Sequence, residues 1–136
     1  MFLLDTNVVS ELRKAARCDA RVVAWQAAQN PQACFLSAIT LLEIRLGIEL
    51  ARKRDRKQAE VWEAWLEQRV KPGFAGRILP VDHKVAEMCG RMHAERPGSF
   101  RDGLILATAV VHEVTVVTRN VKDFSGSGVR VINPWD

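Results

Sequence analysis

The sequence predicts a single α/β domain, in which a short, mostly parallel and twisted sheet of about four or five strands is flanked by helices. Two observations support this prediction. Short apolar runs alternate with longer segments of helical periodicity, and no linker rich in proline, glycine or serine divides the chain. The length of 136 residues is that of one domain. We therefore expect residues 1–136 to form one domain.

Five short, mainly apolar runs are predicted to form the strands. In chain order they are residues 2–4, 34–36, 77–81, 114–118 and 129–131. The fourth run is rich in β-branched residues, which favour strands. Six intervening segments have the length and periodicity of helices, and they are residues 7–14, 20–28, 38–52, 57–70, 83–95 and 102–113. The last helix is nearly all apolar, so we expect it to lie centrally, covered by other elements.

Capping and breaking residues set the ends of these elements. Asn30-Pro31 stops the second helix, because proline cannot continue a helix. Ser37 and Asp82 stand where helix N-caps are expected. Pro72-Gly73 ends the fourth helix, and Gly126-Ser127-Gly128 forms a turn before the last strand.

The composition excludes several classes of protein. Hydrophobic residues make up 48% and charged residues 26%, which is typical of a soluble globular protein. Asp5 interrupts the apolar start too early for a signal peptide, and no uncharged run is long enough for a membrane span. Three widely spaced cysteines predict neither a disulfide framework nor a zinc site. We expect a cytoplasmic protein without a membrane partner, and the net charge of +4 is compatible with a polyanion.

Polar residues follow the predicted strands directly. They are Asp5-Thr6-Asn7 after the first strand, Ser37 after the second, and Thr118-Arg119-Asn120 at the end of the fourth, with Asp123 a little further on. In open α/β sheets, ligands bind beyond the carboxyl ends of the strands. These side chains are therefore the first candidates for a functional site.

Glu43 is the most informative of the acidic residues. Helical spacing places it on one face with Ile39, Leu46, Gly47 and Leu50, which we expect to be the core face. An ionised carboxylate that faces inward without a partner costs several kcal/mol. Glu43 must therefore meet a cation, a set of donors or a water-filled pocket. An ion pair with a core-facing arginine is the plainer reading, and a metal site is the functional one.

Asp5, Asp102 and Asp123 each have an ordinary structural explanation. Asp5 and Asp102 stand where helix N-caps are expected, and Asp123 stands in a turn. If the strands are parallel and adjacent, however, these groups and Glu43 meet at one edge of the sheet. Several carboxylates at close range repel one another, and a divalent cation removes that repulsion. A site built only from oxygen favours Mg²⁺ or Mn²⁺ over zinc.

At this point the residues resemble a known family. The segments LLDTNVVSE, FLSAITLLEIRLGI, DGLILATA and VTVVTRNVKDF resemble the PIN domain, specifically the VapC-type toxins of toxin–antitoxin modules. The segments AGRILPVD and RVINPW are most similar to the FitB-like branch. The resemblance covers nearly the whole chain. It implies a short parallel sheet with helices on both sides, and an endoribonuclease activity that depends on Mg²⁺ or Mn²⁺.

The resemblance also implies roles for particular residues. The family's acidic residues match Asp5, Glu43, Asp102 and Asp123. We expect Asp5 and Asp102 to bind the metal directly, and Glu43 and Asp123 to bind it through water or to orient the nucleophile. The positions that would support the site are Thr6, Asn7, Ser37, Thr118 and Asn120.

Three arginines are candidates for weak phosphate contacts, namely Arg119, Arg101 and Arg45, and plain surface exposure is the alternative for each. The stretch 95–101 looks shorter than is usual in the family, and Arg101 stands where small residues are common. Arg101 is therefore expected either to pair with Asp102 and weaken metal binding, or to hold phosphate. If the short loop displaces Asp102, the protein would be an RNA-binding PIN module with impaired catalysis.

Apolar surfaces predict protein partners. The helix over residues 38–52 carries a second stripe, Leu41-Ile44-Ile48, and its neighbour carries Trp62, Trp65 and Leu66. The stripe predicts either a helix buried on both sides or a homodimer face with a groove for a partner helix. The family resemblance favours a homodimer silenced by a cognate antitoxin, which commonly places a basic residue in the acidic pocket, with RNA as the substrate.

Two signalling or phosphatase folds are the alternatives outside the nucleases. A phosphoaspartate receiver domain has a similar size and needs an acceptor aspartate after its third strand, where Asp82 stands, but no lysine directly follows the fourth strand here. A haloacid-dehalogenase-like phosphatase needs an Asp-x-Asp pair after the first strand. The sequence has Asp5-Thr6-Asn7 there, which excludes it.

Overall fold

The computed structural model describes all 136 residues, Met1–Asp136. The strands are β1 Phe2–Leu4, β2 Cys34–Ser37, β3 Ile78–Leu79, β4 Thr115–Val117 and β5 Val131–Ile132. The helices are α1 Thr6–Leu12, α2 Ala20–Ala27, α3 Ala38–Arg52, α4 Arg56–Trp65, α5 Lys71–Gly73, α6 His83–Glu95, α7 Phe100–His112 and α8 Val121–Phe124. Short 3₁₀ turns cover Ala15–Arg17 and Pro31–Ala33, and a π-helical stretch, Leu66–Val70, joins α4 to α5.

The strands form one five-stranded sheet in the order β3-β2-β1-β4-β5, and every neighbouring pair is parallel. β1 is central, with Phe2 opposite both Cys34 and Thr115. The predicted α/β fold with a short parallel sheet is therefore confirmed. Because all five strands run in one direction, the loops that follow β1, β2 and β4 leave from the same edge of the sheet.

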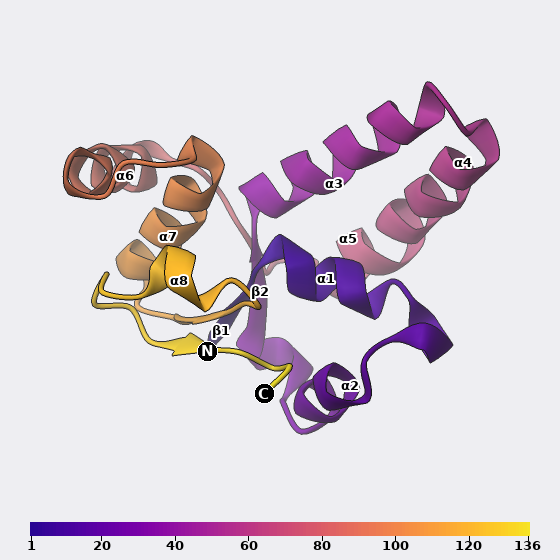
Figure 1. Ribbon diagram of the computed structural model, residues 1–136, viewed down its shortest axis with the longest axis horizontal. Coiled ribbons are helices and arrows are strands. Elements are labelled where there is room, and N and C mark those ends of the chain that lie inside the picture. Colours follow the sequence, from indigo (N-terminus) through magenta and orange to yellow (C-terminus); the bar gives the residue numbers. More distant parts are fainter.

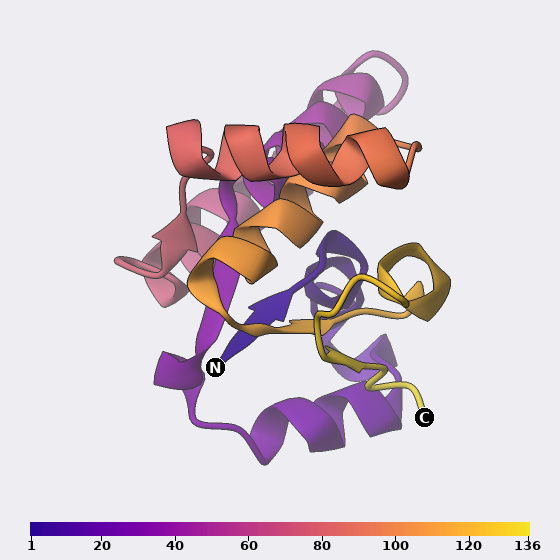
Figure 2. The same cartoon turned by 90° about the vertical axis from the view of Figure 1, so that its left-hand side faces the viewer.

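Helices cover both faces of this sheet. Figure 1 shows α6, α7 and α8 on one side and α1 to α5 on the other, and Figure 2 shows α6 crossing α7 on the outside. Successive side chains of a strand point to opposite faces, so Leu3 and Val116 pack with Ile105 of α7, whereas Leu4 and Val117 belong to the core beneath α1 to α4. None of the helices has both the length and the apolar character needed to cross a membrane.

The face of α3 that points to the core differs from the prediction. Ile44, Ile48 and Ala51 are buried, whereas Leu46 and Leu50 are 42% and 48% exposed. The predicted second stripe is thus largely the core face, and the predicted core face is buried at Ile39 but open to solvent at Leu46 and Leu50. Because α3 is apolar on both sides, periodicity alone could not select the buried one.

Two local predictions near the C-terminus are also corrected. The helix expected to start at residue 102 starts at Phe100, because Ser99 is its N-cap and accepts a hydrogen bond from the backbone N–H of Asp102 at 3.4 Å. Asp123, for which a turn was the ordinary explanation, lies in the short helix α8, Val121–Phe124, which was not predicted from the sequence. Phe124 is 1% exposed and packs into the core with Ile105, so a tertiary contact holds this helix in place.

Candidate active site

Four acidic side chains from distant parts of the sequence face one another at the carboxyl edge of the sheet. Asp5 follows β1, Glu43 lies in the second turn of α3, Asp102 lies in the first turn of α7, and Asp123 lies on α8. The charges of Asp102 and Glu43 both raise the pKa of Asp5, and those of Asp123 and Glu43 raise the pKa of Asp102. The fold therefore brings Asp5, Glu43 and Asp102 within electrostatic range of one another, and Asp123 within range of Asp102.

Asp5 is the most buried of the four, at 5% exposed. Burial is the main cause that raises its pKa, while hydrogen bonds from the Thr118 hydroxyl and the Thr6 backbone N–H act in the opposite direction. Its carboxylate accepts from the N–H of Thr6 at 2.8 Å, from Thr118 Oγ1 at 2.7 Å and from Asn7 Nδ2 at 3.3 Å. A carboxylate has about four lone-pair sites, so about one remains for a ligand.

Thr118 and Asn7 connect the loop after β1 to the loop after β4. Asn7 Nδ2 donates to Thr118 Oγ1 at 3.2 Å, and the backbone N–H of Asn120 donates to the same oxygen at 3.0 Å. Asn7 Oδ1 accepts from the backbone N–H of Arg119 at 3.2 Å. Thr118 is fully buried, so the orientation of the Asp5 carboxylate is fixed by neighbours that are themselves held in place.

Glu43 is held from two sides. The Thr6 hydroxyl donates to Glu43 Oε1 at 2.7 Å and lies 3.0 Å from Thr40 Oγ1. The guanidinium of Arg101 lies 3.7 Å from Glu43 Oε2. The side chain of Glu43 is 22% exposed, so it is partly open to solvent and not buried in the core as the sequence predicted. Arg101 therefore links α7 to α3 beside Asp5, Glu43, Asp102 and Asp123, whose surroundings are called the acidic cleft below.

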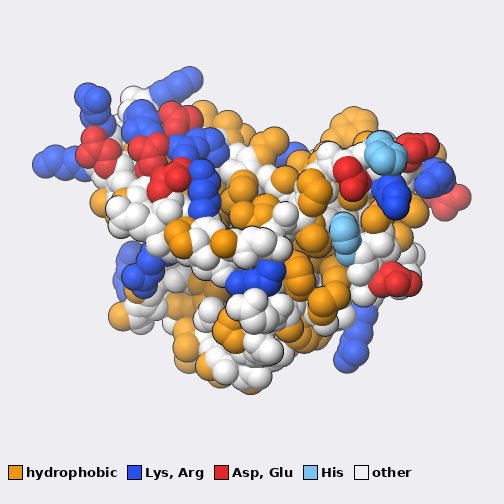
Figure 3. Space-filling model, turned by 180° about the vertical axis from the view of Figure 1, so that it is seen from behind, with side chains coloured by type: hydrophobic (Ala, Val, Ile, Leu, Met, Phe, Trp, Pro, Cys, Tyr) orange, Lys and Arg blue, Asp and Glu red, His pale blue; other side chains and the backbone are white.

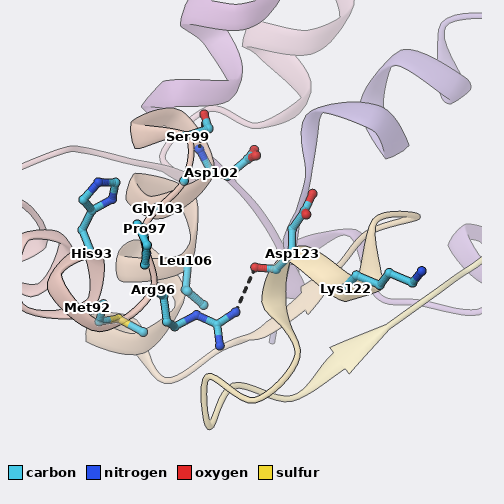
Figure 4. A pocket seen from close by; sticks show the side chains of 11 residues that line it. Met92, His93, Arg96, Pro97, Ser99, Asp102, Gly103, Leu106, Lys122 and Asp123 are labelled. Carbon is cyan, nitrogen blue, oxygen red and sulfur yellow. Dashed lines mark hydrogen bonds between the residues drawn. The ribbon is translucent and has the colours of Figure 1, made fainter.

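Asp102 and Asp123 border a cavity of about 230 Å³ beside the other two carboxylates. Figure 4 shows their side chains extending toward the same space, with Arg96 reaching the backbone of Asp123. Burial is the largest cause that raises the pKa of Asp102, and the charges of Asp123 and Glu43 add to it, whereas Arg101 lowers it. The short loop before α7 thus leaves Asp102 at the acidic edge.

Comparison with known proteins shows the family of the chain. The PIN domain family matches residues 2–125. The chain belongs to the PIN domain family. A VapC ribonuclease, Y4jK of Sinorhizobium fredii, is 40% identical over 100% of this chain and 99% of its own length.

Other PIN proteins of the same type extend the likeness to the structure. The toxin FitB of Neisseria gonorrhoeae is 43% identical over 99% of each chain. The crystal structure of FitAcB from the same organism has a TM-score of 0.88 at 42% identity and covers 99% of each chain. The receiver-like alternative is therefore wrong. In agreement, Asp82 is exposed after the edge strand β3, where it caps α6 by accepting from the backbone N–H of Val85 at 3.0 Å.

Some predicted site residues of this PIN domain lie outside the acidic cleft or act only structurally. Arg45 pairs with Glu63 at 2.5 Å and with Glu67 at 2.8 Å. Figure 3 shows these mixed charges gathered over the α3–α4 hairpin. The structure thus gives no support for a phosphate contact by Arg45. Ser37 is fully buried and caps α3 through the backbone N–H of Ile39. Arg119 follows β4, with its guanidinium 5.1 Å from the centre of the Trp135 ring.

Sequence reasoning missed two parts of the site. Thr40 is fully buried and lies beside Thr6; its position three residues before Glu43, on the same helical face, was the available signal. Arg96 donates to the backbone carbonyl groups of Ser125 at 2.8 Å and of Asp123 at 3.2 Å. No sequence pattern linked Arg96 to α8, because that contact joins segments 27 and 29 residues apart.

The donor set fits a divalent ion that keeps much of its water. No group of three acidic, histidine or cysteine side chains stands close enough to enclose a metal ion. Mg²⁺ commonly uses only one or two carboxylates and retains several waters, whereas structural zinc needs a closed set of four ligands. Asp5, which accepts three hydrogen bonds and has about one lone pair left, is compatible with the first arrangement, and the lack of a closed ligand group is not compatible with the second.

Proposed function

We propose that this PIN protein is an endoribonuclease that depends on Mg²⁺ or Mn²⁺ and acts as the toxin of a toxin–antitoxin pair. The observation that supports the proposal is the electrostatic coupling of Asp5, Glu43 and Asp102, with Asp123 coupled to Asp102, beyond the carboxyl ends of the strands. The identity of 40% to a protein named VapC ribonuclease supports the choice of RNA as the substrate.

Each carboxylate has a role in this proposal. Asp5 and Asp102 would hold the ion directly, because each is at least partly buried beside other carboxylates whose negative charge raises its pKa. Glu43 and Asp123 are less buried than Asp5 and would bind through water or orient the attacking water. When bound, a divalent cation supplies a water of lowered pKa and neutralises charge on the phosphoryl oxygens.

Basic groups of the chain flank these carboxylates. Arg101 lies on the α7 side of the cleft, and Arg119 and Lys122 lie on the side of β4 and α8. All three are exposed, so they are free to contact the phosphates on either side of the scissile bond. Thr6 and Thr118 would hold Glu43 and Asp5 in orientation. Loss of such a supporting bond typically costs about 10- to 100-fold in metal affinity or activity.

The test is cleavage of RNA by the purified protein with Mg²⁺, with Mn²⁺ and with EDTA. We expect cleavage only with a divalent ion, abolished by Asp5→Asn and reduced about 10- to 100-fold by Thr118→Val. Glu60→Gln, an exposed carboxylate of α4, is the matched control and should keep full activity. Cleavage in EDTA, or full activity of Asp5→Asn, would disprove the mechanism. Absence of cleavage with either metal would instead favour the impaired RNA-binding module.

The toxin assignment implies an antitoxin as the second partner. The FitB relative is named a toxin, and the contact of Arg101 with Glu43 indicates that a guanidinium fits in the acidic cleft. An antitoxin with a basic side chain in that cleft would compete with the ion. Co-purification of this chain with the product of a neighbouring gene, and loss of RNA cleavage in the complex, would test the pairing. A complex that cleaves RNA at the rate of the free chain would contradict it.

A further inference from the structure

A cavity of about 230 Å³ adjoins the acidic cleft and extends away from it. Asp102 and Asp123 form its end toward the cleft, and its other walls come from the C-terminal turn of α6, the loop before α7 and the start of α8 (Figure 4). Most of the lining residues are polar or charged. None of them other than the two aspartates takes part in the proposed metal chemistry.

Two flat side chains line this cavity and are held in position. The His93 ring stacks on Phe100, with ring centres 4.2 Å apart and planes inclined by 13°. The guanidinium of Arg96 is fixed by the carbonyl groups of Ser125 and Asp123 at 2.8 and 3.2 Å. Gly103 packs closely against Cys89, because a Cβ there would lie 3.3 Å from Cys89 Sγ, whereas its distance of 3.9 Å from His93 Nδ1 would be an ordinary contact.

The dimensions and chemistry of the cavity select one kind of occupant. It is smaller than the roughly 300–1,000 Å³ of sites for drug-sized ligands, so it has room for a single ring system and not for a base pair. Unpaired RNA bases stack on histidine rings and arginine guanidinium planes. Lys122 also lines the cavity, but its ammonium group points away from Asp102 and Asp123 (Figure 4), so the cavity itself supplies the stacking surfaces and not a phosphate contact.

We propose that this cavity binds one unpaired nucleobase of the RNA, next to the scissile phosphate, with His93 and Arg96 as the stacking surfaces. The proposal rests on the proposed ribonuclease function. It makes His93 and Arg96 residues that position a base next to the bond to be cut, separate from the carboxylates that cut, and stacking of this kind accepts any of the four bases. Phe100, which is 65% exposed, would restrict the motion of the His93 ring by stacking on one of its faces.

Mononucleotides test the cavity without any cleavage. Uniformly ¹⁵N-labelled protein in EDTA is titrated with AMP, GMP, CMP and UMP, and with ribose 5-phosphate as the probe that lacks a base. We expect at least one nucleotide to shift the amide signals of residues 92–99, 102–106 and 122–123, and to bind at least about fivefold more tightly than ribose 5-phosphate. Equal affinity for ribose 5-phosphate and all four nucleotides, or shifts elsewhere only, would overturn the proposal.

Variants assign the stacking to His93. His93→Ala is expected to weaken nucleotide binding about 5- to 100-fold, the range seen when an aromatic stacking partner of a base is replaced by alanine. His93→Phe keeps a flat ring and should restore most of the affinity. His83→Ala, an exposed histidine at the other end of α6, is the matched control and should bind as the unmodified chain does. Unchanged affinity in His93→Ala would exclude His93.

The two proposals fail in different experiments. Base-dependent binding of a mononucleotide without RNA cleavage would support the cavity and contradict the nuclease. Cleavage without base-dependent binding would do the reverse. If Phe100 is instead covered by a second copy of the chain, the residues around it would show shifts on dilution and none with nucleotides, which would also overturn the base-binding proposal.

Discussion

At the scale of single residues, the site contains a carboxylate, that of Asp102, whose charged form is disfavoured by its surroundings. Asp102 lies half-buried in the first turn of α7, where a carboxylate gains about 0.3–1 kcal/mol from the helix N-terminus. Burial, Asp123 and Glu43 act against this gain and raise its pKa above the ordinary value of 3.8. Ionisation of Asp102 in the folded protein is therefore unfavourable. The sequence explained Asp102 as the N-cap of the helix, but the N-cap of α7 is Ser99.

The cost at Asp102 predicts how stability depends on pH. The folded state binds more protons than the unfolded state just above pH 3.8, so Asp102 lowers stability as the pH rises through its folded pKa. Without metal, we expect Asp102→Asn to melt at a higher temperature than the unmodified protein at pH 7. The difference should shrink below about pH 4. Thermal unfolding in EDTA from about pH 3 to pH 8 measures it, and a lower melting temperature of the variant at pH 7 would refute it.

Arg101 is the one cation of the chain that pairs with an acid of the cleft. It must leave Glu43 or share it when an ion binds. An exposed ion pair of this kind contributes about 0.2–1 kcal/mol, so Arg101→Ala should tighten Mn²⁺ binding about 1.5- to 5-fold. Calorimetric titration with Mn²⁺ measures the affinity. Arg91→Ala, an exposed arginine of α6, is the control, and weaker binding in Arg101→Ala would show that Arg101 supports the site instead.

At the scale of elements, helices on different faces of the sheet supply different acids. Glu43 comes from α3 over one face, and Asp102 and Asp123 come from α7 and α8 over the other. The parallel sheet sets their meeting point, because β1, β2 and β4 all end at the same edge. The position of α8 is the least determined by its own sequence, since it has four residues and no side-chain cap.

Phe124 is expected to decide whether α8 holds Asp123 in place. Its side chain is 1% exposed and packs with Leu106 and Ile105 of α7. Replacing a buried phenylalanine by alanine typically costs about 3–5 kcal/mol, so Phe124→Ala should lower the free energy of unfolding by that amount. Denaturation with urea measures the change. Phe100→Ala, at an exposed phenylalanine, should cost less than about 1 kcal/mol, and a loss of similar size in both variants would contradict this account of α8.

At the scale of the whole molecule, α3 leaves an apolar stripe uncovered. Leu42, Leu46 and Leu50 are 48%, 42% and 48% exposed, at helical spacing on one face. Figure 3 shows hydrophobic side chains in the hollow between the α3–α4 hairpin and the α6–α7 side. Contiguous apolar patches mark interaction surfaces. The stripe therefore takes the place of Leu41-Ile44-Ile48 as the expected homodimer face.

Leu46→Glu tests the homodimer. A buried charge without a partner is unfavourable by several kcal/mol, so the variant should be monomeric where the unmodified chain is dimeric. Sedimentation velocity at several concentrations distinguishes the two. Glu87→Leu or another exposed change on α6 should leave the association unchanged. A monomeric unmodified chain at all concentrations would contradict the expected dimer.

The sequence determined the class of fold and the family, and it predicted the residues of the site. Short apolar runs between helical segments predict a parallel sheet. In such a sheet the acidic residues that follow the first and fourth strands lie at its carboxyl edge, because all strands run in the same direction. The tertiary structure decided what depends on contacts between distant segments. It selected the buried face of α3, formed α8 around Phe124, paired Arg101 with Glu43, and joined Arg96 to α8. Periodicity describes one element at a time, whereas burial and pairing are properties of two elements in contact.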